Sequence, residues 1–309
     1  MTPPPAQGRA LSTHEPSSDV RPCVVCGAQS ALSSVRTAVV HSNVKPFASE
    51  TFSVWQCEAC SSIHARDEVD LDHYYAQYPF HGQSMNLPTR LAFRNKLKGL
   101  VALGLSREHR VLDYGCGSGL FVQYLVEQGY VHARGYDAYA SSGPYAEPPG
   151  TGYHFVHSQD VIEHVADPRA FLSTLTQLVV PGALLVIGTP DAGLIDLRAP
   201  QPFVHMLHQP YHRHILSNAA LVTLAQSMDL TVHDVQHGFP GNSRFPGLNG
   251  RFLMRMLKAH GDTLDDTLQG KVPWKWELFT PAAIWDALTG SRRDPGYDMT
   301  VALRVGAAK

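Results

Sequence analysis

The stretch that decides the fold is Arg110-Val-Leu-Asp-Tyr-Gly-Cys-Gly-Ser-Gly-Leu120. Its first residues are mostly apolar and suit a buried strand, and its three alternating glycines let the backbone turn sharply and approach a ligand. Residues 120–128 then have the apolar spacing of a helix, which Gly129 is suited to end. A strand, a glycine turn and a helix in this order predict a loop that binds a nucleotide cofactor.

The spacing of the glycines distinguishes this loop from that of dinucleotide enzymes. Those enzymes use G-x-G-x-x-G, whereas residues 113–119 read D-x-G-x-G-x-G. Glycines at this spacing also suit a tight turn that binds nothing. A second predicted strand, 131–136, ends at Asp137, close to the spacing of about 20 residues at which a carboxylate binds ribose hydroxyls in doubly wound folds.

This D-x-G-x-G-x-G loop resembles motif I of the class I S-adenosylmethionine (SAM) dependent methyltransferases. Residues 153–168 are similar to the fourth strand and following loop of that family, which often reads D-V-x-E-H-x-x-D-P. The matching residues are Asp160, Glu163, His164, Asp167 and Pro168. A predicted helix over 169–180, a turn at Pro181-Gly182 and a strand over 183–188 follow in the family's order. The resemblance covers residues 88–238 and implies an α/β fold with a Rossmann-like, doubly wound, mostly parallel sheet.

The resemblance also implies where SAM binds: at the glycine loop, at Asp137 as the ribose acid and at the end of the fourth strand. The implied cofactor-binding residues are Asp113, Tyr114, Gly115, Cys116, Gly117, Gly119, Asp137, Ser158, Gln159 and Asp160. The small side chain of Cys116 equally suits packing within the loop.

The segment between the second and fourth predicted strands departs from the family. Its members usually have a helix, a third strand and an adenine-contacting acid there, whereas this chain has only residues 138–152, whose glycines and prolines predict a loop. The third strand lies at the sheet edge in the family, so its loss shortens the sheet without breaking the core. Recognition of adenine is then expected from this loop, from backbone groups or from His157, Ser158 and Gln159.

Four of the five cysteines form two C-x-x-C pairs, Cys23 with Cys26 and Cys57 with Cys60. Two such pairs supply four thiolates for a tetrahedral zinc ion. Short strands predicted at 34–40 and 51–56 favour a zinc ribbon. A closed shell of four thiolates leaves no open position, so the metal is expected to be structural. The alternative, two redox dithiols, would need a thioredoxin-like βαβ unit beside them, and none is evident.

The cysteines and the SAM motifs divide the chain into predicted parts. Residues 1–21 are rich in Pro, Ser and Thr and are expected to be a disordered leader. The ribbon at 22–66 is followed by an aromatic linker or lid at 67–87 and by the SAM-dependent domain at 88–309. Within that domain, 239–298 is expected to be a helical insertion before the last strand. Further predicted helices are 88–105, 218–228, 248–260 and 281–288, and further strands are 231–237 and 299–305.

A zinc ribbon, a tyrosine-rich segment and a SAM domain in this order resemble the sugar C-methyltransferases and related natural-product methyltransferases. In those enzymes the equivalent segment folds over the cofactor pocket, which makes Tyr75, Tyr78 and His81 candidates for a lid or an active site. The alternative is a packed tether between domains. The resemblance implies a small-molecule acceptor and a role in secondary metabolism.

Methyl transfer requires an aligned nucleophile and, for many acceptors, a base that removes a proton. Histidine suits that role, and residues 203–217 contain a dense run of histidines after the fifth strand. In related methyltransferases a His precedes an F-S or F-T pair at a helix start, and His212 with Leu216-Ser217 is the closest match, Ser217 being the helix cap. Such a run is also common on solvated surfaces. The catalytic candidates are His212, His164, His214, Glu163, Tyr78 and His81.

Composition limits the partners of the protein. Its 309 residues are 44% hydrophobic, enough for a large core, and its net charge of −2 gives no sign of a polyanionic partner. A second hypothesis is an RNA methyltransferase, which the sequence disfavours because 23–60 carries only Arg36 and Lys45 against two glutamates. A third is a non-catalytic scaffold that binds zinc and SAM. No membrane-spanning run or signal peptide is evident, so we expect a cytoplasmic monomer or homodimer.

Overall fold

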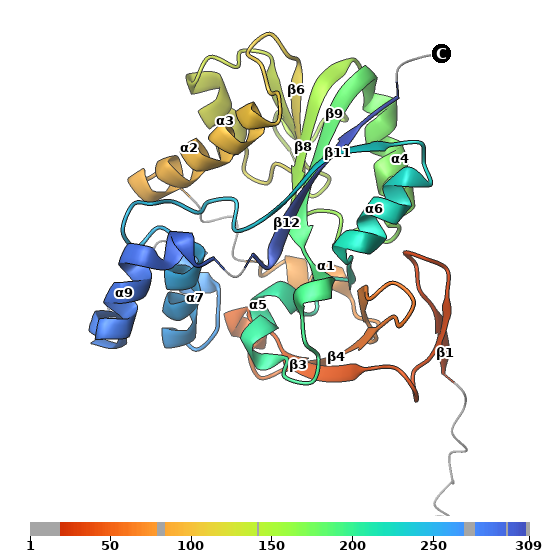
Figure 1. The fold of residues 1–309 in the computed structure, drawn as a ribbon, viewed down its shortest axis with the longest axis vertical. Helices are drawn as coiled ribbons and strands as arrows, with labels where there is room; N and C mark the ends of the chain where they lie inside the picture. The colour runs from red at the N-terminus through yellow and green to blue at the C-terminus, as the bar shows by residue number, and fades with distance from the viewer. Residues whose placement is uncertain (1–18, 79–83, 141, 269–275, 295, 307–309) are drawn as a thin grey trace, which may run out of the picture.

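The computed structural model describes residues 19–78, 84–140, 142–268, 276–294 and 296–306. Most of the predicted leader and the candidate His81 lie outside these ranges. The large sheet occupies the upper part of Figure 1, and the N-terminal strands lie below it. Within the described ranges, no helix is both long enough and apolar enough to cross a bilayer.

Six strands form the large sheet: β6 (Val111–Tyr114), β7 (Ala133–Tyr136), β8 (Tyr153–Gln159), β9 (Val179–Pro190), β11 (Thr231–His237) and β12 (Asp298–Arg304). Their order is β11-β12-β9-β8-β6-β7. The four strands from β6 to β9 are parallel, and β12 is antiparallel to both of its neighbours. The chain passes from β6 to β7 on one side and then back to β8 on the other, which is the switch of direction in a doubly wound sheet. The predicted fold is confirmed, and the described part of 138–152 contains neither helix nor strand.

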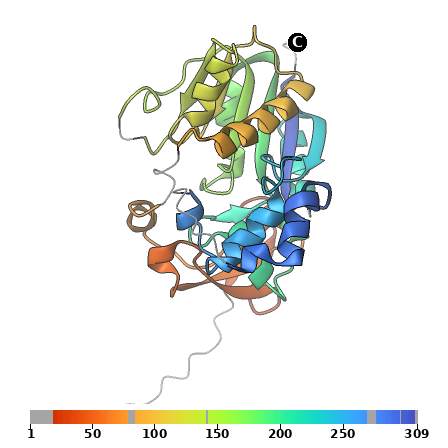
Figure 2. The same cartoon turned by 90° about the vertical axis from the view of Figure 1, so that its left-hand side faces the viewer.

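Four helices cover the sheet: α2 (Leu87–Ala102), α3 (Leu120–Glu127), α4 (Pro168–Leu178) and α6 (Asn218–Gln226). Alternation of side chains along each strand decides which helices they meet. Val111 of β6 and Phe155 of β8 pack with α2 and α3, whereas their neighbours Leu112 and Val156 pack with α4 and α6. Figure 2 looks onto the side that α2 covers, while α4 and α6 lie on the far side of the sheet.

One predicted boundary is wrong, because the turn expected at Pro181-Gly182 lies inside a strand. α4 ends at Leu178, and β9 begins at Val179 and runs to Pro190. The pairing of β9 with β8 shifts its register here, because residues 180–183 of β9 lie opposite His154 alone and form an irregular bulge that includes Pro181 and Gly182. Gly182 permits this bulge because its φ of +82° lies in the left-handed region.

The N-terminal part contains two small sheets. One pairs β1 (Val20–Pro22) with β2 (Gln29–Ala31), and the other has the order β10-β5-β4-β3. Its strands are β3 (Thr37–His41), β4 (Thr51–Gln56), β5 (Ile63–Ala65) and β10 (His214–Ile215). β4 has the predicted bounds, and β3 begins three residues later than predicted. Because β10 comes from residues far along the chain, the ribbon shares its sheet with the segment that follows β9.

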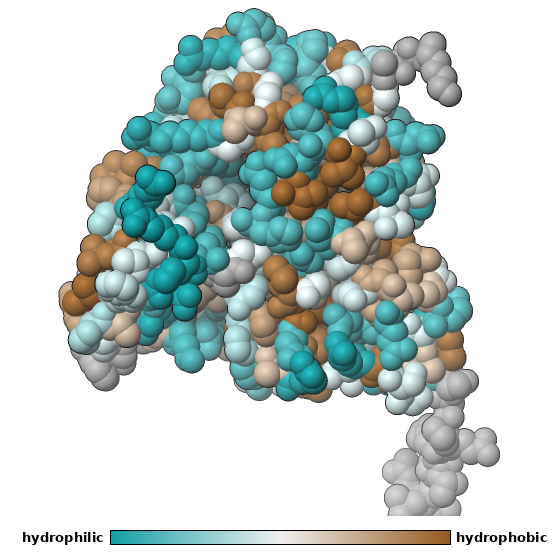
Figure 3. Space-filling model, in the orientation of Figure 1, coloured by the Kyte–Doolittle hydropathy of each residue, from teal (hydrophilic) through white to brown (hydrophobic). Residues whose placement is uncertain are grey.

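The insertion before β12 is helical, as predicted. Its helices α7 (Gly250–Ala259) and α9 (Pro281–Thr289) pack together, and Asp286 of α9 pairs with Arg255 and Arg293. The remaining elements are α1 (Leu71–Tyr75), α5 (Val204–Leu207), α8 (Asp265–Leu268) and 3-10 helices at 45–47, 192–194, 201–203, 276–279 and 290–292. Exposed hydrophobic side chains of α9 contribute to the brown surface along the lower left edge of Figure 3.

Candidate functional site

The glycine loop joins the end of β6 to the start of α3. All three glycines have positive φ angles, +82° at Gly115, +54° at Gly117 and +75° at Gly119, which would strain a residue with a side chain. A Cβ atom at Gly115 would also collide with Val161, and one at Gly119 with the ring of Tyr145. At Gly117 a Cβ atom would meet open space. The loop is therefore packed at both ends and accessible at Gly117.

Asp137 is bound to this loop by its side chain. Its Oδ2 atom accepts a hydrogen bond from the backbone N–H of Gly117 at 2.8 Å, and its Oδ1 atom accepts one from the N–H of Tyr139 at 2.9 Å. Each carboxylate oxygen has a further lone pair, so the group can still accept bonds from two hydroxyls. The structure thus brings the glycine loop and the predicted ribose acid together.

The side chains of Asp113, His157 and Ser158 lie beneath the loop, away from its accessible side. Asp113 is 5% exposed and accepts a 2.7 Å hydrogen bond from Nδ1 of the buried His157, whose pKa is lowered by burial. The buried Ser158 donates its hydroxyl to the carbonyl of Tyr114 at 2.9 Å. Burial and these bonds hold the His157 and Ser158 side chains in place, and recognition of adenine by them or by Gln159 stays a prediction.

Lys96 of α2 is a candidate cofactor residue that the sequence did not predict. Its side chain lies at the carboxyl end of the sheet, where the charges of Asp113 and Asp160 favour its cationic form. Burial acts more strongly in the other direction and lowers the pKa of Lys96. Its Nζ atom lies 4.8 Å from the centroid of the Phe121 ring. Asp160 also accepts a 2.8 Å bond from Nε2 of Gln159.

The loop after β8 places Glu163 and His164 beside His212, although His212 is far along the chain. Glu163 is completely buried, and neither carboxyl oxygen has a hydrogen-bond partner among the described residues. The Thr189 hydroxyl is near but outside hydrogen-bond geometry. Burial raises the pKa of Glu163 well above its usual value. The rings of His164 and His212 are 4.8 Å apart and nearly perpendicular.

The hydrogen bonds of His212 fix which of its nitrogens is free. Its Nδ1 atom lies 2.7 Å from the carbonyl oxygen of Met206, so Nδ1 carries the proton and donates it. Burial lowers the pKa of His212 well below its usual value, so the ring is neutral near pH 7. Its Nε2 atom keeps a lone pair and lies 3.8 Å from Oε1 of Glu163. This nitrogen can accept a proton or bind a metal.

The tyrosine-rich segment folds onto this cluster. The hydroxyl of Tyr75 lies 2.9 Å from Nδ1 of His164, and that of Tyr78 lies 2.9 Å from Nε2 of His208. Burial lowers the pKa of both histidines and raises the pKa of both tyrosines, so the tyrosine hydroxyls donate. The ring of Tyr75 also stacks on that of Tyr139, at 4.6 Å between centroids. The segment therefore links the histidines to the loop that follows Asp137.

The segment that contains the glycine loop matches a known protein family. Residues 83–235, which contain the glycine loop, Asp137 and Glu163, match the sequence profile of a family described as a methyltransferase domain. Residues 83–235 form a methyltransferase domain. The strand order of the large sheet and the lone antiparallel β12 agree with the fold that this domain implies.

The methyltransferase is similar to curated bacterial proteins named ubiquinone biosynthesis O-methyltransferase. One, from a Caulobacter species, is 31% identical over an alignment of 102 positions, and the match covers 26% of this chain and 40% of the relative. Another, from Dinoroseobacter shibae, is 28% identical over an alignment of 149 positions, and the match covers 41% of this chain and 54% of the relative. The chain thus spans about half the length of these relatives. A solved structure, the 1,6-didemethyltoxoflavin-N1-methyltransferase of Burkholderia thailandensis, is 13% identical with a TM-score of 0.43, and the match covers 82% of this chain and 96% of that one.

The four cysteines of the methyltransferase's ribbon converge on one point. The Sγ atoms of Cys23 and Cys60 are 3.6 Å apart, those of Cys26 and Cys57 are 3.7 Å apart, and all four lie within 4.8 Å of one another. Four thiolates at this separation fit a tetrahedral zinc ion. Nε2 of His64 lies 3.2 Å from Sγ of Cys23, and an N–H there would stabilise the thiolate.

His214 lies on the ribbon side of the methyltransferase. It belongs to β10, where its backbone pairs with His64 of β5, and the two rings are 6.3 Å apart. Burial lowers the pKa of His214 to about 3. It is not part of the group formed by Glu163, His164 and His212. The last catalytic candidate, His81, is outside the described residues.

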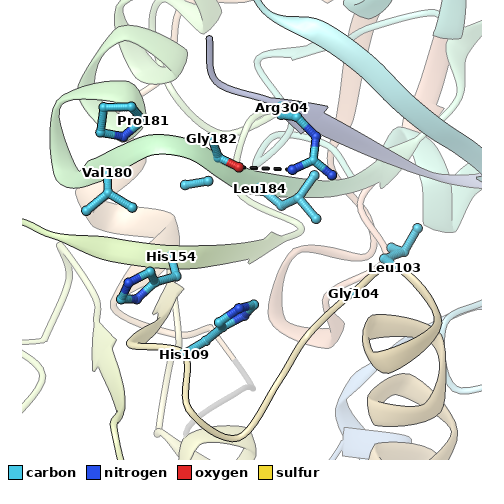
Figure 4. A pocket seen from close by; sticks show the side chains of 10 residues that line it. Leu103, Gly104, His109, His154, Val180, Pro181, Gly182, Leu184 and Arg304 are labelled. Atoms are coloured by element: carbon cyan, nitrogen blue, oxygen red, sulfur yellow. Dashed lines mark hydrogen bonds between the residues drawn. The ribbon is translucent and has the colours of Figure 1, made fainter. Parts of the chain in front are cut away.

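A pocket also opens at the opposite end of the sheet. Figure 4 shows His109 and His154 on one side and Arg304 on the other, with Arg304 donating to the carbonyl of Gly182 at 3.0 Å. This end carries the amino ends of the parallel strands, whereas ligands of doubly wound sheets bind at the carboxyl ends. None of the predicted site residues lines this pocket.

Proposed function

We propose that this protein transfers the methyl group of SAM to a small-molecule acceptor of natural-product or sugar-like chemistry. The observation that carries the proposal is the contact between Gly115 of the cofactor loop and Val161 of the loop after β8. Because Val161 is two residues before Glu163, the predicted cofactor site and the Glu163 cluster occupy the same end of the sheet. A methyl donor and a proton-accepting group can therefore meet one acceptor.

The residues at the glycine loop fit SAM. Asp137 offers its remaining lone pairs to the two ribose hydroxyls, and the open backbone at Gly117 lets the cofactor approach. Lys96 supplies a cation for the carboxylate of the methionine part. When bound, SAM supplies an electrophilic methyl group on a sulfonium. The chain's own task is to align the acceptor and to remove a proton.

His212 is the group that we propose as the proton acceptor. Its Nδ1–H is fixed by the Met206 carbonyl, which leaves Nε2 as the basic nitrogen. The Glu163 carboxyl group, 3.8 Å away, would favour the imidazolium formed when the proton arrives. On this proposal His212→Ala lowers turnover by roughly 10²-fold or more. If the turnover rate is unchanged, His212 is not the proton acceptor and another residue removes the proton.

Zinc is the second proposed ligand, with a structural role. The four thiols lie within 4.8 Å of one another, and a closed shell of four thiolates leaves no position for a substrate. The zinc ion would support the candidate active site indirectly, by stabilising the ribbon sheet to which β10 belongs.

Calorimetry with SAM tests the proposal first. The full-length, zinc-loaded protein is expected to bind one SAM, and Asp137→Ala is expected to bind it much more weakly. Incubation with methyl-labelled SAM and a metabolite extract, followed by mass spectrometry, then identifies the labelled product. If the protein binds no SAM, the proposed activity is wrong, and if only RNA is labelled, the acceptor class is wrong.

A further inference from the structure

The buried carboxyl group of Glu163 lacks the partners that such a group requires. It is 0% exposed, and no described donor lies within hydrogen-bond geometry of either oxygen. Within the part of the chain that the structure describes, the basic group near it is the neutral His212 ring, and at 3.8 Å the two groups are too far apart for a hydrogen bond. A carboxylate buried without a partner costs several kcal/mol, so a group of this kind takes up a proton, is paired or binds a cation.

Two imidazoles complete a set of ligands around this carboxylate. Glu163, His164 and His212 each present a ligand atom, and these atoms lie within 4.8 Å of one another. Two ligands with bonds of about 2.1 Å to the same ion are at most about 4.2 Å apart, so the 3.8 Å between His212 and Glu163 already fits. Only a small inward movement of the third group is needed.

The surroundings of the histidines are those of metal ligands. A ligating histidine usually donates its other N–H to a carbonyl or carboxylate, as Nδ1 of His212 does to Met206 at 2.7 Å. Nδ1 of His164 is bonded to the hydroxyl of Tyr75 at 2.9 Å. Metal binding through this nitrogen would exchange that hydrogen bond for a coordination bond.

We infer that Glu163, His164 and His212 bind a divalent transition-metal ion such as Zn²⁺ or Mn²⁺. Two imidazoles with one carboxylate favour such an ion over Mg²⁺ or Ca²⁺, which prefer oxygen ligands alone. Three protein ligands leave an open position, which a hydroxyl oxygen of the acceptor can take. This last step rests on the proposed function and changes the role of His212 in it. With the metal bound, His212 is a ligand and not the base. The hydroxyl of the acceptor then loses its proton to solvent, because coordination to the metal lowers its pKa.

Titration of the full-length protein with Mn²⁺ tests the metal site without relying on turnover. Mn²⁺ is the probe because it binds thiolates poorly, which leaves zinc in the ribbon undisturbed. Electron paramagnetic resonance of free Mn²⁺ should show one ion bound per chain beyond the ribbon zinc. Glu163→Gln keeps the size of the side chain but removes its charge, and it should weaken Mn²⁺ binding at least about 10-fold. His154→Asn, which removes an exposed histidine at the other end of the sheet, should bind Mn²⁺ like the unaltered protein.

The outcomes separate this inference from the proposed function. If the unaltered protein binds no Mn²⁺, or if Glu163→Gln binds it equally well, the metal site is wrong. SAM binding measured on the same samples decides the other question. If the protein binds SAM but not Mn²⁺, the proposed methyl transfer stands with His212 as the base. If it binds Mn²⁺ but not SAM, the metal site is supported and the methyl-transfer proposal is wrong.

Discussion

Oδ1 of Asn43 accepts a 2.6 Å hydrogen bond from Nδ1 of His208, although the two residues are 165 positions apart in the chain. Asn43 is fully buried and lies between β3 and β4 of the ribbon. Nε2 of His208 in turn receives the hydroxyl of Tyr78. The ribbon therefore orients a histidine that contacts the tyrosine-rich segment, which gives the N-terminal part a direct role in shaping the candidate site.

Asn43→Ala tests this link. Removing the amide leaves the buried N–H of His208 without an acceptor, so we expect the free energy of unfolding to fall by about 1–3 kcal/mol. Val39→Ala is the control, since Val39 is 59% exposed on the same ribbon and its truncation should change stability by less than about 0.5 kcal/mol. Denaturant titrations of both variants decide the matter, and equal losses would contradict the prediction.

Gly117→Ala should weaken SAM binding at least about 10-fold, because its Cβ atom would occupy the space through which the cofactor reaches the backbone. Gly143→Ala is matched to it: both glycines have positive φ angles, and neither has a neighbour within 4 Å of an added Cβ atom. Both variants should therefore lose about 1 kcal/mol of stability. Calorimetry distinguishes them, and similar SAM affinities for the two would show that Gly117 is not at the cofactor site.

Lys96→Met is expected to weaken SAM binding about 10-fold through loss of the cation that meets the carboxylate. Lys98→Met is the control on the same helix, since Lys98 is exposed. Binding of 5′-methylthioadenosine, which lacks the amino-acid part of SAM, should be unchanged in both variants. If Lys96→Met weakens both ligands equally, the lysine supports the fold of the site and does not contact the carboxylate.

Cys57→Ser should lower the zinc content below one ion per chain and reduce the free energy of unfolding by at least about 2 kcal/mol, because metal binding is coupled to folding. Cys57 is fully buried, and its cluster includes residues of α6 as well as of the ribbon. Cys116→Ser, which alters the cysteine outside the cluster, should retain one zinc per chain. Metal analysis by mass spectrometry with thermal unfolding provides the measurement. Full zinc retention by Cys57→Ser would argue against a four-thiolate site.

The pH dependence of stability should reflect the buried His157. Burial lowers its pKa in the folded protein below the value of about 6.5 in the unfolded chain. The neutral ring therefore makes its full contribution to the free energy of unfolding above pH 6.5. As the pH falls from there towards the folded-state pKa, this contribution decreases by about 1.4 kcal/mol per pH unit for one proton. In His157→Asn the unfolding free energy should fall less steeply as the pH drops below 6.5. An identical slope would show that His157 does not take up this proton.

Local patterns were sufficient for much of the fold. The bounds of β4 and β11 match those predicted, because strand alternation and the residues that end these strands are properties of short segments. The helix cap at Ser217 was also predictable, since its hydroxyl accepts from the N–H of Ala220, three residues on. The paired cysteines and the glycine loop were predictable for the same reason, because their chemistry depends on spacing within a few residues.

The sequence by itself therefore determined the doubly wound sheet, the glycine loop at the end of β6 and the convergence expected of two C-x-x-C pairs. Only the tertiary structure decided that β10 completes the ribbon sheet, that the charges of Asp113 and Asp160 act on Lys96 and that Glu163 meets His212. The physical reason is that these contacts join residues far apart in the chain. Their approach is set by the packing of helices and strands on one another, which no local period encodes.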